Sequence, residues 1–197
     1  NLGGEAGSAG HEYLAILVPQ GKEAAESALA AILDRWAIDD HAAALLVAKL
    51  RLFAPQITDH ALVEVALCLL YDGSVVSVDG ARGRYTTPDD AIMAGSLDVI
   101  WSEPEPLRWE ECDPSVAGSD GGRWVCPLGS VLWLADYKLG EDRNVPRATR
   151  NRQILWGAVL AAKWTGASRV MPALCFVEHD SMPAGRWDMR RQPGARG

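Results

Sequence analysis

The stretch VLWLADYKLG (residues 131–140) sets the fold of the second half of the chain. Its apolar residues predict a buried strand, and Gly140 predicts that the chain turns away after the strand. Because residues two apart on a strand point to the same side, Asp136 and Lys138 should project together. They stand at the end of the strand, where side chains are accessible. The pattern therefore predicts a strand that presents a carboxylate beside an ammonium.

A carboxylate and a lysine placed in this way suit the hydrolysis of a phosphodiester. Asp136 can hold Mg²⁺ or Mn²⁺, hard cations that prefer oxygen ligands. Lys138 can orient an attacking water, help to deprotonate it, and offset negative charge in the transition state. The alternative is a structural ion pair on an edge strand, because D-x-K is a short pattern.

A second strand with a single acid precedes this one. In AGSLDVIW (residues 94–101), Asp98 stands among apolar residues. An unpaired carboxylate in a half-buried strand is costly, so Asp98 should have a hydrogen-bonding, ionic or metal partner. If the two strands are neighbours, Asp98 and Asp136 can share one divalent ion.

Residues 144–164 predict the clearest helix in the chain, with Pro146 in its first turn and Gly166 closing it. Gln153 lies in a largely apolar part of this helix, where its amide can hold the lysine or a water. Three arginines near its start are available for phosphate contacts. They are Arg147, Arg150 and Arg152.

The remaining segments predict helices first and strands afterwards. Helical periodicity indicates helices at 22–36, 40–52 and 59–71, and strands are expected at 92–101, 131–137 and 170–177. The short β-branched run at 74–78, followed by the turn signal at 79–80, indicates a hairpin. Residues 102–130 read as mostly loop. This order predicts an α/β fold, a mixed central sheet flanked by helices with an N-terminal helical segment.

A chain of 197 residues with 48% hydrophobic and 23% charged residues is typical of one globular domain. We expect that domain to span 11–180, with a helical part (11–71) and an α/β core (72–177). Residues 1–10 should be a disordered lead-in, and 181–197 a loose basic tail. The apolar stretches are too short for a membrane span, and no signal pattern is visible, so a cytoplasmic protein is expected.

The net charge of −7 is unevenly spread along the chain. Residues 1–142 carry 9 Lys or Arg against 23 Asp or Glu, or −14, and residues 143–197 carry 10 against 3, or +7. A basic third attached to an acidic remainder suits a polyanion-binding face beside a carboxylate metal site. A simply solvated acidic surface is the alternative.

The three stretches together resemble a known family. AGSLDVIW, VLWLADYKLG and RNRQILWGAVLAA (residues 150–162) look like the RecB-like branch of the PD-(D/E)XK nuclease superfamily. They match its G-x-x-D strand, its D-x-K-x-G strand and its helix with a glutamine. The resemblance covers about residues 94–177, under half of the chain. It implies a restriction-endonuclease-like core.

The resemblance also implies roles for particular residues. Asp98 and Asp136 would be ligands of Mg²⁺ or Mn²⁺, Lys138 the catalytic lysine, and Gln153 the motif glutamine. Many members add a histidine from an upstream helix, and His60 is the candidate for this ligand.

Other features fit the family less well or not at all. His60 would have Glu64 one turn later on the expected helix, whereas His11 shows no ligand spacing. Where the family often has a tyrosine after the glutamine, this chain has Trp156 and Gly157. Residues 88–89 spell the "PD" of the superfamily name, but they precede the strand and read as a cap or turn.

The expected function is therefore metal-dependent hydrolysis of DNA phosphodiester bonds, exonuclease-like, in repair, recombination or phage biology. DNA is the expected partner, RNA stays open, and no protein partner is indicated. One alternative is a catalytically inactive domain of the same fold that binds nucleic acid or protein. Another is an unrelated α/β binding domain with a chance D-x-K.

Overall fold

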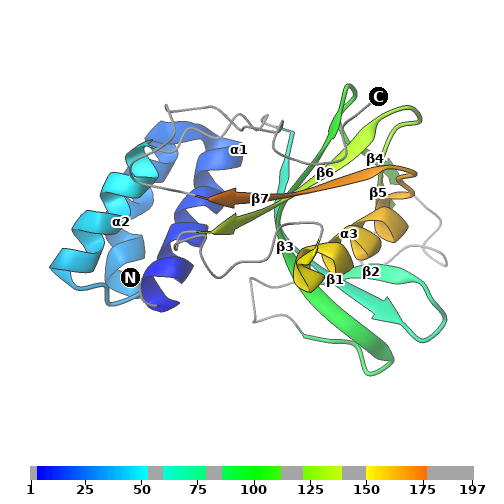
Figure 1. Ribbon diagram of the computed structural model, residues 1–197, viewed down its shortest axis with the longest axis horizontal. Helices are drawn as coiled ribbons and strands as arrows, with labels where there is room; N and C mark the ends of the chain where they lie inside the picture. Colours follow the sequence, from blue (N-terminus) through cyan, green and yellow to red (C-terminus); the bar gives the residue numbers. More distant parts are fainter. Residues whose placement is uncertain (1–3, 53–59, 79–85, 112–121, 139–149, 177–197) are drawn as a thin grey trace.

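The computed structural model describes residues 4–52, 60–78, 86–111, 122–138 and 150–176. Two helices come first, and a sheet with one packing helix follows (Figure 1). The elements are α1 (Gly4–Arg35), α2 (Asp40–Leu52), β1 (Leu62–Leu70), β2 (Val75–Val78), β3 (Ala91–Glu103), β4 (Arg108–Glu111), β5 (Gly122–Val125), β6 (Val131–Lys138), α3 (Arg152–Thr165) and β7 (Val170–Phe176). The predicted α/β class, with a mixed sheet and an N-terminal helical segment, is confirmed.

The main sheet has five strands in the order β2-β1-β3-β6-β7. Its pairs are antiparallel except β6–β7, which run parallel. A parallel pair needs a crossover long enough to hold a helix, and α3 lies in that connection. β4 and β5 form a separate two-stranded ribbon inside the segment that was expected to be mostly loop.

The sheet buries a different core on each face. Val99, Trp101 and Tyr137 pack with the buried residues of α1 and α2. Ile100, Leu132 and Leu134 pack with α3. Neighbours in sequence thus enter opposite cores, as the two-residue period of a strand requires. The site described below lies where α1 meets the sheet.

The N-terminal residues correct the expected disordered lead-in. α1 begins at Gly4, and Ala6 and Ala9 are buried in the helical core. The Gly- and Ala-rich composition suggested a loose segment, but small side chains also allow close helix packing. At Gly21 the backbone turns to φ 82° and ψ 178°, so α1 consists of two helical segments. Only the second matches the predicted helix at 22–36.

The third predicted helix, at 59–71, is wrong. Residues 62–70 form strand β1, which pairs with β2 on one side and β3 on the other. A short, almost continuously apolar run fits a buried strand as well as a helix, so its periodicity alone cannot decide between them. The helical part of the chain therefore ends before β1. The extended segment predicted at 74–78 is present as β2, but it pairs back onto β1 through a turn that contains Gly73 (φ 83°). The turn predicted at 79–80 lies outside the described residues.

α3 begins later than predicted. The side chain of Asn151 accepts hydrogen bonds from the amides of Gln153 and Ile154, which makes it the N-cap. The helix ends at Gly166 in a left-handed conformation, as predicted. Residues 144–149, with Arg147, and the tail at 181–197 lie outside the described residues. Among the helices described, none is long and apolar enough to span a membrane.

Candidate metal centre

Three neighbouring strands bring three acids to one level of the sheet. The pairs Val63–Val99 and Val65–Leu97 place Glu64 across from Asp98 on β1 and β3. On the other side of β3, the pairs with β6 end at Val99–Ala135, one residue short of both Asp98 and Asp136. The acids therefore follow one another across β1, β3 and β6.

The backbone departs from regular pairing around these acids. Beyond the last β3–β6 pair, the amide of Tyr137 donates a hydrogen bond of 2.7 Å to Oδ2 of Asp98. On β1, Glu64 has a φ of 50°, a left-handed conformation that L-residues rarely adopt. Strained residues of this kind cluster at functional sites, where the surrounding structure must hold them in place. Both departures occur where the acids meet.

A histidine from α1 completes the cluster. His11 is buried, and its Nδ1 lies 3.3 Å from Oδ2 of Asp98. One ligand atom from each of His11, Glu64 and Asp98 lies within 4.8 Å of the other two. Atoms that bind one cation at about 2.0–2.4 Å lie no farther apart than about twice that distance. These three residues could therefore hold one ion, and we call them the metal cluster.

Asp136 and Lys138 form an ion pair beside the metal cluster. Nζ of Lys138 lies 2.6 Å from Oδ2 of Asp136, and Asp136 is buried. Burial raises the pKa of Asp136, and the negative charge of Asp98 raises it further, while Lys138 and His11 oppose the rise. Asp98 and Asp136 thus repel each other inside the protein. A buried repulsion of this kind is relieved when a cation binds.

The structure brings some of the predicted site residues together and leaves others apart. Asp98, in the interior of β3, lies level with Asp136 and Lys138 at the end of the neighbouring strand β6. His60 is exposed in the turn before β1, not on a helix, and is not in the metal cluster. Its role as a ligand stays a prediction.

The residues predicted on α3 lie at its beginning. Gln153 is exposed, and its side chain makes no hydrogen bond with any other described residue, Lys138 included. Arg150 and Arg152 are exposed as expected of phosphate-binding residues, and Arg147 lies outside the described part.

Sequence reasoning missed His11 and placed Glu64 on a helix. The spacing between His11 and Asp98 carries no signal, because the contact depends on how α1 docks against the sheet. The residues that follow His11 could have indicated that it is buried. Tyr13 and Leu14 are core residues of α1, and a histidine buried beside them needs a polar partner.

Comparisons with family models, with curated proteins and with solved structures found no match to this chain.

Proposed function

We propose that this chain is a divalent-metal-dependent nuclease that hydrolyses DNA phosphodiester bonds in an exonuclease-like manner. The observation that carries the proposal is the metal cluster of His11, Glu64 and Asp98 lying beside the Asp136–Lys138 ion pair. The ligands for a cation and a lysine for the chemistry thus occur at one level of three adjacent strands.

The donor set fits Mg²⁺ or Mn²⁺. Glu64 and Asp98 offer carboxylate oxygens, and Asp136 stands next to them with a pKa raised by burial and by Asp98. Carboxylates suit Mg²⁺ and Mn²⁺, and the imidazole of His11 favours the transition metal of the two. When bound, the cation would act as a Lewis acid that polarises the phosphoryl group and lowers the pKa of water.

Lys138 would supply the remaining electrostatic catalysis. Its ammonium is held 2.6 Å from the carboxylate of Asp136, so its position is fixed before substrate arrives. From there it can orient the attacking water and offset negative charge that develops on the phosphate. Asp98 in turn is oriented by the amide of Tyr137, which holds one of its oxygens in place.

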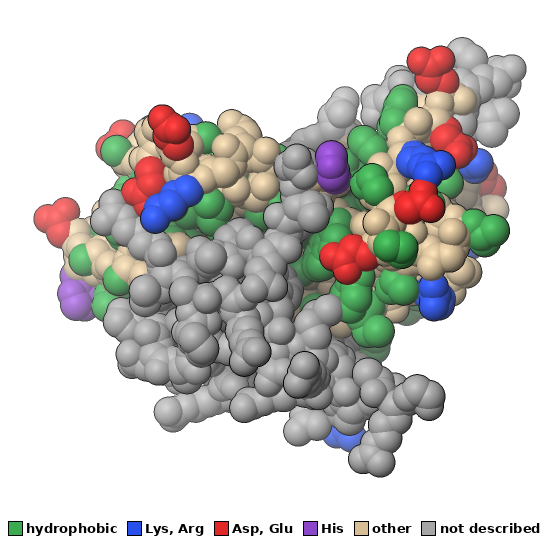
Figure 2. Space-filling view, turned by 90° about the horizontal axis from the view of Figure 1, so that it is seen from above, with side chains coloured by type: hydrophobic (Ala, Val, Ile, Leu, Met, Phe, Trp, Pro, Cys, Tyr) green, Lys and Arg blue, Asp and Glu red, His purple; other side chains and the backbone are tan. Residues whose placement is uncertain are grey.

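The charge of the neighbouring segment suits a polyanionic substrate. Residues 150–176 contain four basic residues and no acidic one. On the face seen in Figure 2, basic and acidic side chains of the described residues are interspersed. The case for a DNA-binding face therefore rests on this local segment and its exposed Arg150 and Arg152.

A metal-dependent cleavage assay tests the proposal. Wild-type protein should cut linear, circular or single-stranded DNA in Mn²⁺ or Mg²⁺ and not in EDTA. Asp98→Asn should abolish cleavage, because it removes a charged ligand but keeps an oxygen that can accept from Tyr137. Asp89→Asn is the matched control, since Asp89 is exposed in a turn before β3. Equal cleavage by Asp98→Asn and wild type would refute the proposal.

A catalytically inactive binding domain for nucleic acid or protein is the second candidate. The position of Gln153 favours it, because the amide expected to support Lys138 is exposed and makes no hydrogen bond to it. DNA binding without cleavage under any metal condition would select this candidate.

A further inference from the structure

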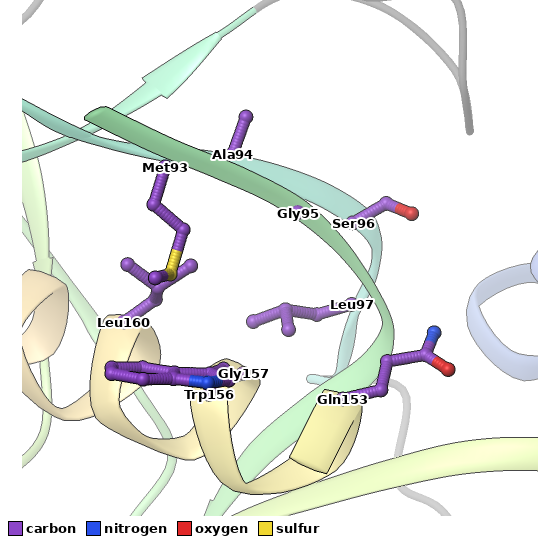
Figure 3. Close-up of a pocket in the computed structure, with 9 residues that line it drawn as sticks. All are labelled: Met93, Ala94, Gly95, Ser96, Leu97, Gln153, Trp156, Gly157 and Leu160. Atoms are coloured by element: carbon purple, nitrogen blue, oxygen red, sulfur yellow. The ribbon is translucent and has the colours of Figure 1, made fainter. Parts of the chain in front are cut away.

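A groove of about 420 Å³ lies between β3 and α3 (Figure 3). Its size is within the range of small-molecule sites, about 300–1,000 Å³. The groove lies beside Gly95, where an added Cβ would meet only Leu160, at 3.9 Å. Along the helix, Gly157 lets α3 approach the sheet closely, since a Cβ there would lie 2.8 Å from Leu97. The two glycines thus let a groove form beside a tightly packed helix.

Two groups in the groove can recognise a flat, polar ring. Trp156 is 50% exposed, and its indole ring borders the groove beside Gly157 and below Met93 (Figure 3). Gln153 lies at the other end of the groove, with an amide that makes no hydrogen bond to another described residue. An aromatic face and an amide with both donor and acceptor match the stacking surface and the edge of a nucleobase.

Positive charge flanks the tryptophan along α3. Arg152, one turn before Trp156, is exposed, and Lys163 lies about two turns after it. Lys163 contacts the backbone oxygen of Gly73 at 3.2 Å and remains exposed. An aromatic platform between cations, in a segment without acids, is the arrangement that binds single-stranded nucleic acid.

We propose that this groove binds an unpaired base of single-stranded nucleic acid, stacked on Trp156, with an adjoining phosphate on Arg152. Leu97 lines the groove on the α3 face of the sheet, and the next residue, Asp98, contacts His11 of α1 and belongs to the metal cluster. The inference rests on the proposed nuclease function and names its substrate as a single-stranded segment or frayed end. A helix from a protein partner is the competing occupant, but two features favour nucleic acid. They are the basic flanks and the Gln153 amide, which makes no hydrogen bond to another described residue.

Binding of a fluorescein-labelled twelve-residue oligo(dT), followed by fluorescence anisotropy in Ca²⁺ or EDTA, tests the proposal without any cleavage. Trp156→Leu should weaken binding roughly tenfold, since a base stacked on an aromatic ring is lost. Trp156→Phe should recover part of the affinity. Leu155→Ala is the matched control, because Leu155 is exposed on the same helix and does not line the groove. Binding of duplex DNA should change less than binding of oligo(dT).

A second measurement needs no variant. Wild-type protein should bind an oligonucleotide with abasic positions about as weakly as Trp156→Leu binds oligo(dT). Equal binding of abasic and normal strands, or a Trp156→Leu loss no larger than that of Leu155→Ala, overturns the proposal. Wild-type protein that binds no oligonucleotide but self-associates through Trp156 overturns it as well, in favour of a protein occupant.

The binding and cleavage assays separate the two proposals. A Trp156→Leu binding defect in a protein that never cleaves keeps the base-binding groove and refutes the nuclease. Metal-dependent cleavage with unchanged oligo(dT) binding by Trp156→Leu refutes the groove and keeps the nuclease.

Discussion

The two faces of the central sheet bury different kinds of group. Where α1 meets the sheet, His11 contacts Asp98 near the ion pair of buried Asp136 with half-buried Lys138, so each buried charge needs an opposite charge close to it. On the face covered by α3, Leu97, Leu134 and Leu160 pack together. The stability of this face therefore depends on how closely its apolar side chains fit. Substitutions on the first face should therefore change chemistry and ion binding, whereas those on the second should change stability.

The largest effect should follow from Lys138→Met. The substitution keeps the apolar stem but removes the ammonium beside Asp136, so cleavage should fall by about two to three orders of magnitude. DNA affinity measured in Ca²⁺ should change little. Lys22→Met, at an exposed position of α1, is the control and should cleave like wild type. A Lys138→Met protein that cleaves normally would remove this lysine from the mechanism.

His11→Ala should lower Mn²⁺ affinity at least tenfold in isothermal titration, because it removes one of three converging ligands. His41→Ala, at an exposed position of α2, should bind Mn²⁺ like wild type. His60→Ala decides between the two candidate histidines. If it lowers the affinity as much as His11→Ala does, the metal cluster is incompletely assigned.

Replacement by alanine should lower the stability of the fold at one helical glycine and raise it at another. In Gly157→Ala, the new Cβ would lie 2.8 Å from Leu97 and 3.3 Å from Leu134, so overpacking should destabilise the fold by about 1–2 kcal/mol. In Gly7→Ala, the Cβ meets nothing within 4 Å, and α1 should gain about 0.5–1 kcal/mol from helix propensity. Urea unfolding of both variants measures the difference. Equal shifts would mean that α3 is not seated against the sheet as described.

The smallest effect concerns the start of α3. Asn151→Ala removes a side chain that accepts from two amides and should cost about 1 kcal/mol of unfolding free energy. Asn151→Asp keeps an accepting oxygen and should stay near wild type in the same thermal or urea melt. If Asn151→Ala leaves the unfolding free energy unchanged, Asn151 is not the N-cap and α3 begins elsewhere.

The sequence predicted the parts of the fold that are decided locally. The strands with Asp98 and Asp136 and the end of α3 at Gly166 carry strong local signals, and each lies where predicted. β1 was mistaken for a helix because its apolar run has no distinguishing period, and its strand partners lie elsewhere in the chain. His11 was missed for a related reason. Its partner is defined by the docking of α1, which no spacing in the sequence records.

The row of acids across β1, β3 and β6 also limits how the chain can change in length. A strand's side chains alternate between faces, so inserting or deleting one residue before Glu64, Asp98 or Asp136 within its strand would turn that acid to the opposite core. The apolar residues could partly repack after such a change, but the carboxylates could no longer meet. Length variation among descendants of this sequence should therefore gather around the β4–β5 ribbon and spare the three acid-bearing strands.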